Sequence, residues 1–267
     1  MLQDRYYLWE KGKTPYFNPD FKQDEPFLTP FISEGQGNIA VIVCPGGAYV
    51  GKAGHEGAPI AQMLQANGIS GFVLDYRVTP YRYPAIRADV NRAVRFVRYH
   101  AKEFGVDPDK IGVLGFSAGG HLALMAANLW DEGLGEEAID EIDRVSCRVN
   151  ASILCYPVLN LMPSYSHFGT HDNLLAGLPD EADLSRALSA PALITEQTPP
   201  TFLWQTFEDN AVPLPGMMEA INAMFWHKVP CEVHIYPDGP HGLGLGTEHH
   251  IASWSPLLVK WLKKTLA

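Results

Sequence analysis

Short apolar runs alternate along the chain with segments in which apolar residues recur at helical spacing. The apolar runs predict buried strands at residues 39–43, 71–74, 110–114, 151–156, 201–204 and 231–236. Helices are predicted over residues 56–67, 87–104, 120–127 and 255–266; the second places Val90, Ala93, Val94 and Val97 on one face. Strands that alternate with helices indicate an α/β fold, in which helices cover both faces of a mostly parallel sheet.

Three segments interrupt this alternation. Residues 1–37 are rich in turns and aromatic side chains, and we expect them to pack on an edge of the domain. Residues 131–144 are acidic and helix-prone, which indicates a surface excursion. Residues 160–200 are too long for a plain loop between two strands, so they predict a small helical insertion over the functional site. We expect all 267 residues to form one α/β domain.

The composition restricts the kind of partner and compartment. The formal net charge of −10 and the lack of a basic stripe argue against a nucleic-acid partner. No apolar run is long enough to span a bilayer, and the first residues do not resemble a signal peptide. Cys44, Cys147, Cys155 and Cys231 form no Cys-x-x-Cys motif. We therefore expect buried free thiols, no disulfide, no metal site and a cytoplasmic location.

The most informative motif is Gly-Phe-Ser-Ala-Gly at residues 115–119. It has the G-x-S-x-G pattern and lies between a predicted strand and a predicted helix. A sharp strand–turn–helix connection exposes the hydroxyl of Ser117, and it needs glycine where strand and helix pass close together. The serine also lies at a helix N-terminus, which favours a developing negative charge. This context indicates the nucleophile of a serine hydrolase.

A nucleophilic serine needs a general base. We select His241, which follows the last predicted strand in a loop rich in glycine and proline, because catalytic groups gather at the carboxyl ends of open parallel sheets. His121 lies four residues after the serine, but on the helix it should point away from the hydroxyl and be a buried core residue. We expect His249 and His250 at the surface, without a metal role.

The base needs an acid to orient it, and the hydrolase order along the chain is serine, acid, histidine. Asp209 fits this order and also follows a predicted strand. Its neighbour Glu208 is the main competitor. Asp238, three residues before His241, is a weaker candidate that can instead shape the turn.

Backbone N–H groups for an oxyanion are expected from two places. The loop at residues 44–49 follows a predicted strand, and its glycines allow N–H groups to face a ligand, so Gly47 and Ala48 are assigned to it. The second donor is the N–H of Ala118, the residue after the nucleophile. Taken alone, Gly46-Gly47 is typical of a simple turn; its place after the strand favours the functional interpretation.

With these residues the chain resembles the α/β-hydrolase superfamily, and within it the esterase and lipase group of bacterial acetyl-xylan esterase-like proteins. The similarity runs from about Asn38 to the C-terminus. Its most specific segment is Gly-Phe-Ser-Ala-Gly-Gly-His-Leu-Ala at residues 115–123. The other matching segments are residues 41–49, 55–57, 75–77, 198–203 and 241–244.

The resemblance implies roles for individual residues. Ser117, Asp209 and His241 would form the triad, and Gly47, Ala48 and Ala118 would lie near the oxyanion. Ala48 stands where the family often has a third glycine; it keeps the N–H but can reduce the room for the acyl group. His55 and Glu56 match a family feature near the site entrance, for which we expect a structural role.

The resemblance also implies the chemistry: ester hydrolysis through an acyl-enzyme, without metal or cofactor. The expected substrate carries a short acyl group, acetyl above all, on a carbohydrate such as an acetylated xylo-oligosaccharide. Tyr49 and Trp204 are candidates for stacking on sugar rings, or else core residues. The alternatives are a general short-chain carboxylesterase, an aryl formamidase, or a catalytically silent receptor of the same fold. The oligomeric state is not predicted.

Overall fold

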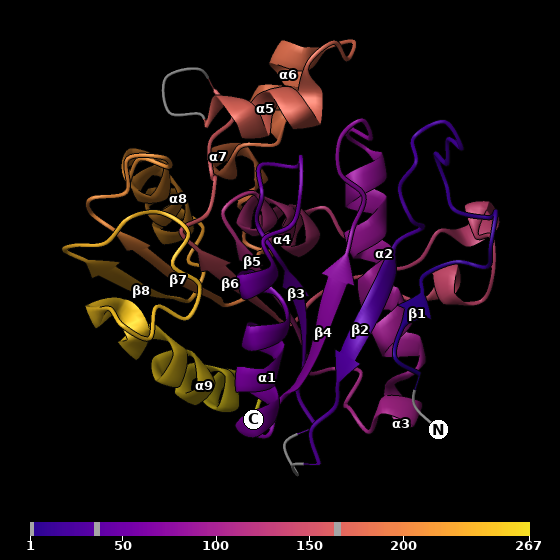
Figure 1. Cartoon of the computed structure of the whole chain (residues 1–267), viewed down its shortest axis with the longest axis horizontal. Coiled ribbons are helices and arrows are strands. Elements are labelled where there is room, and N and C mark those ends of the chain that lie inside the picture. Colours follow the sequence, from indigo (N-terminus) through magenta and orange to yellow (C-terminus); the bar gives the residue numbers. More distant parts are fainter. Residues whose placement is uncertain (1–2, 35–37, 163–166) are drawn as a thin grey trace.

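The centre of the molecule is a twisted sheet of mostly parallel strands (Figure 1). The computed structural model describes residues 3–34, 38–162 and 167–267. Within these ranges the sheet has eight strands in the order β1-β2-β4-β3-β5-β6-β7-β8. In this order, the strands β4, β3, β5, β6, β7 and β8 run parallel, whereas β2 is antiparallel to β4 and to β1. The strands are β1 (Tyr6–Tyr7), β2 (Phe27–Phe31), β3 (Ala40–Cys44), β4 (Ser70–Asp75), β5 (Ile111–Phe116), β6 (Ala151–Cys155), β7 (Thr201–Thr206) and β8 (Cys231–Tyr236).

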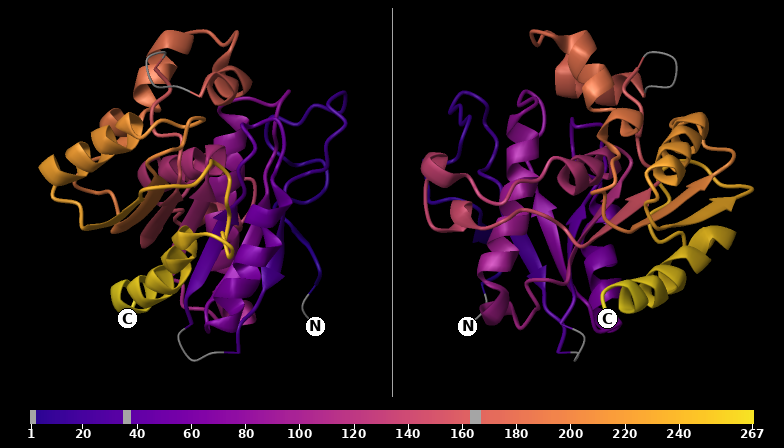
Figure 2. Two further views of the ribbon diagram at one scale, coloured as in Figure 1. Left: turned by 60° about the vertical axis from the view of Figure 1, so that its left-hand side comes forward. Right: turned by 180° about the vertical axis from the view of Figure 1, so that it is seen from behind.

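Helices cover both faces of the sheet, as the sequence predicts (Figure 1, Figure 2). On one face, α1 (Ala58–Ala66) and α9 (Trp254–Thr265) bury apolar side chains against the strands. On the other face lie α2 (Ala85–Tyr99), α4 (Ala118–Asn128) and α8 (Pro215–Trp226). Burial of apolar surface on both sides explains why every residue of β3, β5 and β6 is buried and why these strands are continuous apolar runs.

Several elements differ from the prediction. The helix predicted over residues 87–104 is divided at His100 into α2 and the short α3 (Ala101–Phe104). The N-terminal segment packs on the edge of the sheet, as expected, but it does so as strands β1 and β2, which the turn-rich sequence conceals. The strand β2 contains Pro30, a residue that sheets tolerate at edges and bulges.

The acidic segment at residues 131–144 forms no α-helix. It contains two short 3₁₀ helices, Gly135–Glu137 and Ile142–Arg144. Its carboxylates are used by arginines of α2: Arg92 is paired with Asp140 and Asp143, and Arg95 with Asp131. Tertiary ion pairs therefore determine the conformation of a segment whose composition favours a helix.

The predicted insertion contains three helices between β6 and β7. These are α5 (Phe168–Leu175), α6 (Glu181–Ala187) and α7 (Ala190–Leu193), and Figure 1 shows α5 and α6 above the carboxyl ends of the strands. The side chain of Asn173 in α5 donates to the carbonyl oxygen of Ala48, at 2.8 Å. Residues 163–166 of the predicted insertion lie outside the described residues.

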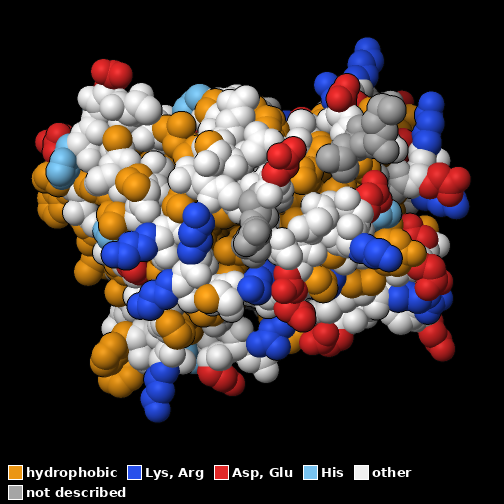
Figure 3. Space-filling model, turned by 90° about the horizontal axis from the view of Figure 1, so that it is seen from below, with side chains coloured by type: hydrophobic (Ala, Val, Ile, Leu, Met, Phe, Trp, Pro, Cys, Tyr) orange, Lys and Arg blue, Asp and Glu red, His pale blue; other side chains and the backbone are white. Residues whose placement is uncertain are grey.

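The cysteines differ from the prediction at one position. Cys44, Cys147 and Cys155 are buried and free, as expected, but Cys231 is exposed because it begins β8 at the edge of the sheet. No helix in the described part of the chain is both long enough and apolar enough to cross a membrane. The end of the molecule opposite α5 and α6 carries acidic and basic side chains interspersed (Figure 3).

Candidate active site

Ser117 lies on a sharp turn between β5 and α4. Its backbone has φ 52° and ψ −119°, a conformation that non-glycine residues rarely adopt. The motif needs glycine at positions 115 and 119, because neighbouring backbone leaves no room there for a side chain. A Cβ on Gly115 would lie 1.9 Å from the carbonyl oxygen of Gly119, and one on Gly119 would lie 2.1 Å from that of Cys44. The strand–turn–helix context inferred from the sequence is therefore present.

Ser117, His241 and Asp209 form a continuous hydrogen-bonded series. The hydroxyl oxygen of Ser117 lies 2.8 Å from Nε2 of His241, and Nδ1 of His241 lies 2.6 Å from Oδ2 of Asp209. Because a carboxylate only accepts, the Nδ1–H group donates to Asp209, which leaves Nε2 to accept from the serine. The Asp209 side chain is fully buried, whereas the imidazole is 23% exposed. This arrangement suits a nucleophile, a base and an orienting acid.

The loop after β7 holds Asp209. Oδ1 of Asp209 accepts hydrogen bonds from the N–H groups of Ala211 and Val212, at 3.0 and 2.8 Å, which leaves Oδ2 for the imidazole. The competing acids, Glu208 and Asp238, are both exposed. The sequence could not exclude Glu208 or Asp238 as the acid, and the hydrogen bond from the imidazole of His241 favours Asp209.

The loop at residues 44–49 lies beside Ser117. A Cβ on Gly46 would lie 3.0 Å from the Cβ of Ser117. Gly47 has φ 135° and Ala48 has φ 52°, so successive peptide groups turn sharply here. Among the described residues, no hydrogen bond uses the N–H of Gly47, Ala48 or Ala118. These three groups are the donors that the sequence predicted for an oxyanion.

Tyr49 and Trp204 do not have the predicted role. Both side chains are fully buried. The hydroxyl of Tyr49 donates to Nδ1 of His121 at 2.9 Å, and the Trp204 indole stacks on Trp254 with ring centroids 5.3 Å apart. Neither ring is open to a sugar, so the predicted stacking is wrong for both.

His121 is a buried core residue, as expected. Its Nε2 donates to the carbonyl oxygen of Leu188 at 2.8 Å. Burial lowers the pKa of His121 to about 4, so the ring is neutral at neutral pH. A neutral ring agrees with the hydrogen bond that it accepts from Tyr49.

Sequence reasoning did not find two further groups near the site. His167 accepts the N–H of Thr170 at the start of α5; burial and then the charge of His241 lower the pKa of His167. Phe207, directly after β7, is 69% exposed and lines, with Asp209, a hollow of about 560 Å³. The position of Phe207 after a predicted strand is the signal that could have identified it.

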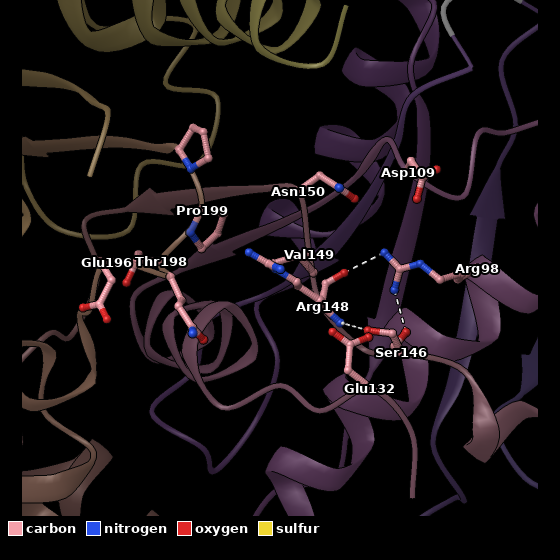
Figure 4. Close-up of a pocket in the computed structure, with 12 residues that line it drawn as sticks. Arg98, Asp109, Glu132, Ser146, Arg148, Val149, Asn150, Glu196, Thr198 and Pro199 are labelled. Carbon is pink, nitrogen blue, oxygen red and sulfur yellow. Dashed lines mark hydrogen bonds between the residues drawn. The ribbon is translucent and has the colours of Figure 1, made fainter. Parts of the chain in front are cut away.

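A second hollow, of about 500 Å³, lies at the other end of the strands (Figure 4). Its lining residues Asn150 and Pro200 directly precede β6 and β7. Arg98 donates there to the carbonyl oxygens of Ser146 and Arg148, both at 2.6 Å. The guanidinium holds the loop together, and the hollow is separated from Ser117 by the length of the strands.

Comparison with known proteins identifies a matching family model and similar curated proteins. A family model described as BD-FAE matches residues 30–219. Endo-1,4-beta-xylanase B of Butyrivibrio fibrisolvens is 32% identical over 221 residues, which are 80% of this chain and 34% of that protein. The acetylxylan esterase of Xylanibacter ruminicola is 31% identical over 221 residues, which are 81% of this chain and 43% of that protein. The chain thus spans less than half the length of these two curated relatives.

Two solved structures resemble the chain over most of its length. The acetyl ester-xyloside bifunctional hydrolase from Caldicellulosiruptor lactoaceticus has a TM-score of 0.92 and 41% sequence identity, covering 97% of this chain and 95% of that one. The carboxylesterase Cest-2923 from Lactobacillus plantarum has a TM-score of 0.74 and 26% identity, covering 90% of this chain and 94% of that one.

Proposed function

Since the chain belongs to the BD-FAE family and has the α/β-hydrolase fold, we propose that it is a serine esterase that removes short acyl groups, acetyl above all, from carbohydrate. The predicted resemblance to acetyl-xylan esterase-like α/β-hydrolases is confirmed by its relatives, which are named as esterases and hydrolases. The observation that carries the mechanistic proposal is the hydrogen-bonded series of Ser117, His241 and Asp209.

The proposed mechanism begins when Oγ of Ser117 attacks the ester carbonyl carbon. Nε2 of His241 takes the serine proton, while Asp209 accepts from Nδ1–H and stabilises the imidazolium. The tetrahedral oxyanion accepts hydrogen bonds from the N–H groups of Ala118 and of the Gly47–Ala48 turn. Collapse breaks the bond to the alcohol, which leaves with the proton from Nε2. Water then attacks the acyl-enzyme by the same route and releases the acid.

The proposed substrate is an acetylated xylo-oligosaccharide. Support comes from the names of two relatives, an acetylxylan esterase and an acetyl ester-xyloside bifunctional hydrolase. The exposed ring of Phe207, which lines a hollow with Asp209, and that of Phe168, at the start of α5, suit contact with a sugar, in place of Tyr49 and Trp204. The free thiols favour a reducing, cytoplasmic location, where such oligosaccharides would be imported.

The substitution Ser117→Ala tests the mechanism. We expect hydrolysis of p-nitrophenyl acetate to fall by about 10³-fold or more, because the nucleophile is lost, while the circular dichroism spectrum stays that of the wild type. Ser146→Ala, at the far end of the strands, is the matched control. A fluorophosphonate should label the wild type and the control but not Ser117→Ala. Wild-type activity in Ser117→Ala contradicts the mechanism, and an unlabelled wild type indicates a binding module instead.

Substrate profiling separates the remaining alternatives. Acetate release from defined acetylated xylo-oligosaccharides should exceed hydrolysis of longer acyl esters and of an N-formyl arylamine. Preference for butyryl or longer p-nitrophenyl esters would indicate a general carboxylesterase, for which the likeness to the Lactobacillus plantarum carboxylesterase is the supporting observation.

A further inference from the structure

Glu56 is a buried carboxylate beneath the candidate active site. It ends a short 3₁₀ helix, Gly54–Glu56, and is 2% exposed. Each of its oxygens has one hydrogen bond: Oε2 accepts the N–H of Gly46 at 2.7 Å, and Oε1 accepts the hydroxyl of Tyr156 at 2.6 Å. A buried carboxylate is costly, and its place here is explained by these two bonds.

Tyr156 connects this carboxylate to the loop that carries the base. Its hydroxyl donates to Glu56 and accepts the N–H of Gly244, at 2.8 Å, three residues after His241. Its ring packs edge-to-face on the imidazole of His241, with centroids 4.9 Å apart and planes at 69°. Burial, and then the charge of Glu56, raise the pKa of Tyr156, so the hydroxyl keeps the proton that it donates.

The neighbouring His55 makes a parallel connection. Its Nε2 lies 2.8 Å from the carbonyl oxygen of Gly242 and so donates to it, and it is 3.7 Å from Oε1 of Glu56. No lysine or arginine pairs with Glu56 among the described residues. The segment Gly54–Glu56 is thus hydrogen-bonded to two loops. Glu56 bonds Gly46, directly before the proposed oxyanion donors, and His55 bonds Gly242 in the loop of His241.

The bond to Gly46 also determines which N–H groups can meet an oxyanion. The N–H of Gly46 is taken by Glu56, so the next two, of Gly47 and Ala48, are the ones left for the substrate. A Cβ on Gly46 would lie 2.7 Å from Oε2 of Glu56, which shows how closely the carboxylate supports this turn.

We propose that Glu56 and Tyr156 are a pair of positioning residues that fixes the turn at residues 46–48 and the loop of His241 relative to each other and to Ser117. Neither residue forms a hydrogen bond with Ser117 or with a nitrogen of His241, although the ring of Tyr156 packs on the imidazole. The inference rests on the proposed esterase function. A displacement of about 1 Å between donors and nucleophile can cost about 10²-fold in rate, so a rigid connection between the two loops has a direct effect on kcat.

Tyr156→Phe and Glu56→Gln test the pair. Tyr156→Phe keeps the ring against His241 but leaves Gly244 N–H and Glu56 Oε1 without their partner. Glu56→Gln keeps one acceptor oxygen and loses the other. We expect each to lower kcat for p-nitrophenyl acetate by about 10- to 100-fold, with KM changed by less than about 3-fold. Their effects should be strongly non-additive in the double variant.

The chain offers a matched control pair. The hydroxyl of Tyr6 donates to Glu103 at 3.3 Å near the β1 edge of the sheet. Tyr6→Phe and Glu103→Gln remove the same groups there, and both should leave kcat within about 2-fold. All kcat values are to be expressed per active site titrated to completion with the fluorophosphonate, so that misfolded molecules do not count.

A transition-state analogue distinguishes positioning from a general structural role. A trifluoromethyl ketone that forms a tetrahedral adduct with Ser117 should lose affinity in the two variants by the same factor as kcat/KM. If Tyr156→Phe and Glu56→Gln keep the wild-type kcat per titrated site, or the wild-type affinity for the ketone, the inference is overturned. The proposed function still stands in that case, provided that the wild type hydrolyses the ester through Ser117. A wild type without Ser117-dependent hydrolysis overturns both.

Discussion

At the scale of single residues, Ser117 has a backbone conformation that its side chain disfavours. A non-glycine residue at positive φ costs on the order of 1–3 kcal/mol. Surrounding hydrogen bonds hold it: the N–H of Ser117 donates to Cys155 at 3.0 Å, and its carbonyl accepts from Val158 and His121, both at 3.1 Å. The strain aims the hydroxyl at His241, and it is maintained by bonds to the end of β6, to the residues that follow β6 and to α4.

His121, one turn further along α4, gives a prediction at the same scale. Its pKa of about 4 in the folded chain lies below the ordinary value of about 6.5 in the unfolded chain. Below that ordinary value the unfolded chain binds the extra proton, so stability present at neutral pH is lost as pH falls. We expect a loss of about 2 kcal/mol from His121 between pH 7.5 and pH 5.

Urea unfolding of the wild type and of His121→Gln at the two pH values measures this contribution. Glutamine keeps a donor for Leu188 but does not titrate. The wild type should therefore lose about 2 kcal/mol more than the variant, because other groups contribute equally to both. Equal losses in the two proteins would contradict a neutral buried histidine.

At the scale of elements, local sequence predicts the parallel core well. The strands β3, β5 and β6 are buried on both faces, so they are apolar throughout and visible as runs. Ser117 and Asp209 follow buried strands, β5 and β7, and His241 follows the edge strand β8, which is why the three could be selected from the sequence. The helix α8 was not predicted because its apolar residues form no clear stripe, and Phe225 and Trp226 at its end are exposed.

The insertion helix α5 gives a prediction at the scale of elements. It is connected to the loop at residues 44–49, which carries the proposed oxyanion donors, by the hydrogen bond from Asn173 to the carbonyl oxygen of Ala48. Such a bond contributes about 0.5–1.5 kcal/mol, so we expect Asn173→Ala to lower kcat/KM for p-nitrophenyl acetate by about 2- to 10-fold. The melting temperature should change little, because this part-buried bond between α5 and the loop at residues 44–49 lies outside the core.

Asn67→Ala is the matched control for α5, since Asn67 makes an equivalent bond of 2.8 Å to the carbonyl oxygen of Met63 at the end of α1. Its kcat/KM should equal that of the wild type. If Asn173→Ala also keeps wild-type kcat/KM, α5 does not support the loop at residues 44–49.

At the scale of the whole molecule, buried arginines join segments that periodicity cannot connect. Arg92 bonds the carbonyl oxygen of Leu8 and the acidic excursion, and Arg77 bonds Pro15 near the N-terminus and Asp89 in α2. These partners lie up to 84 positions apart along the chain. The sequence predicts which segments are irregular, but the energies that place them come from such long-range pairs.

The pair of Arg77 and Asp89 gives the prediction at this scale. Both side chains are buried and lie 2.6 Å apart. Burial raises the pKa of Asp89, and the charge and hydrogen bonds of Arg77 oppose that rise. Arg77→Met removes the guanidinium charge and its hydrogen bonds, and leaves the buried carboxylate with the backbone N–H of residue 77 but without its charged partner. We expect it to destabilise the fold by about 3–5 kcal/mol at pH 7.

This penalty should shrink as pH falls. In the variant the folded pKa of Asp89 lies further above the unfolded value, so the folded chain binds more protons between the two, and its stability decreases as pH rises through that window. Urea unfolding at pH 7 and pH 5, each compared with the wild type at the same pH, should give the smaller difference at pH 5. Adding Asp89→Asn to Arg77→Met should remove the pH dependence of the difference. A penalty independent of pH would show that Arg77 acts through its bonds to Pro15 and Ala85 rather than through the charge of Asp89.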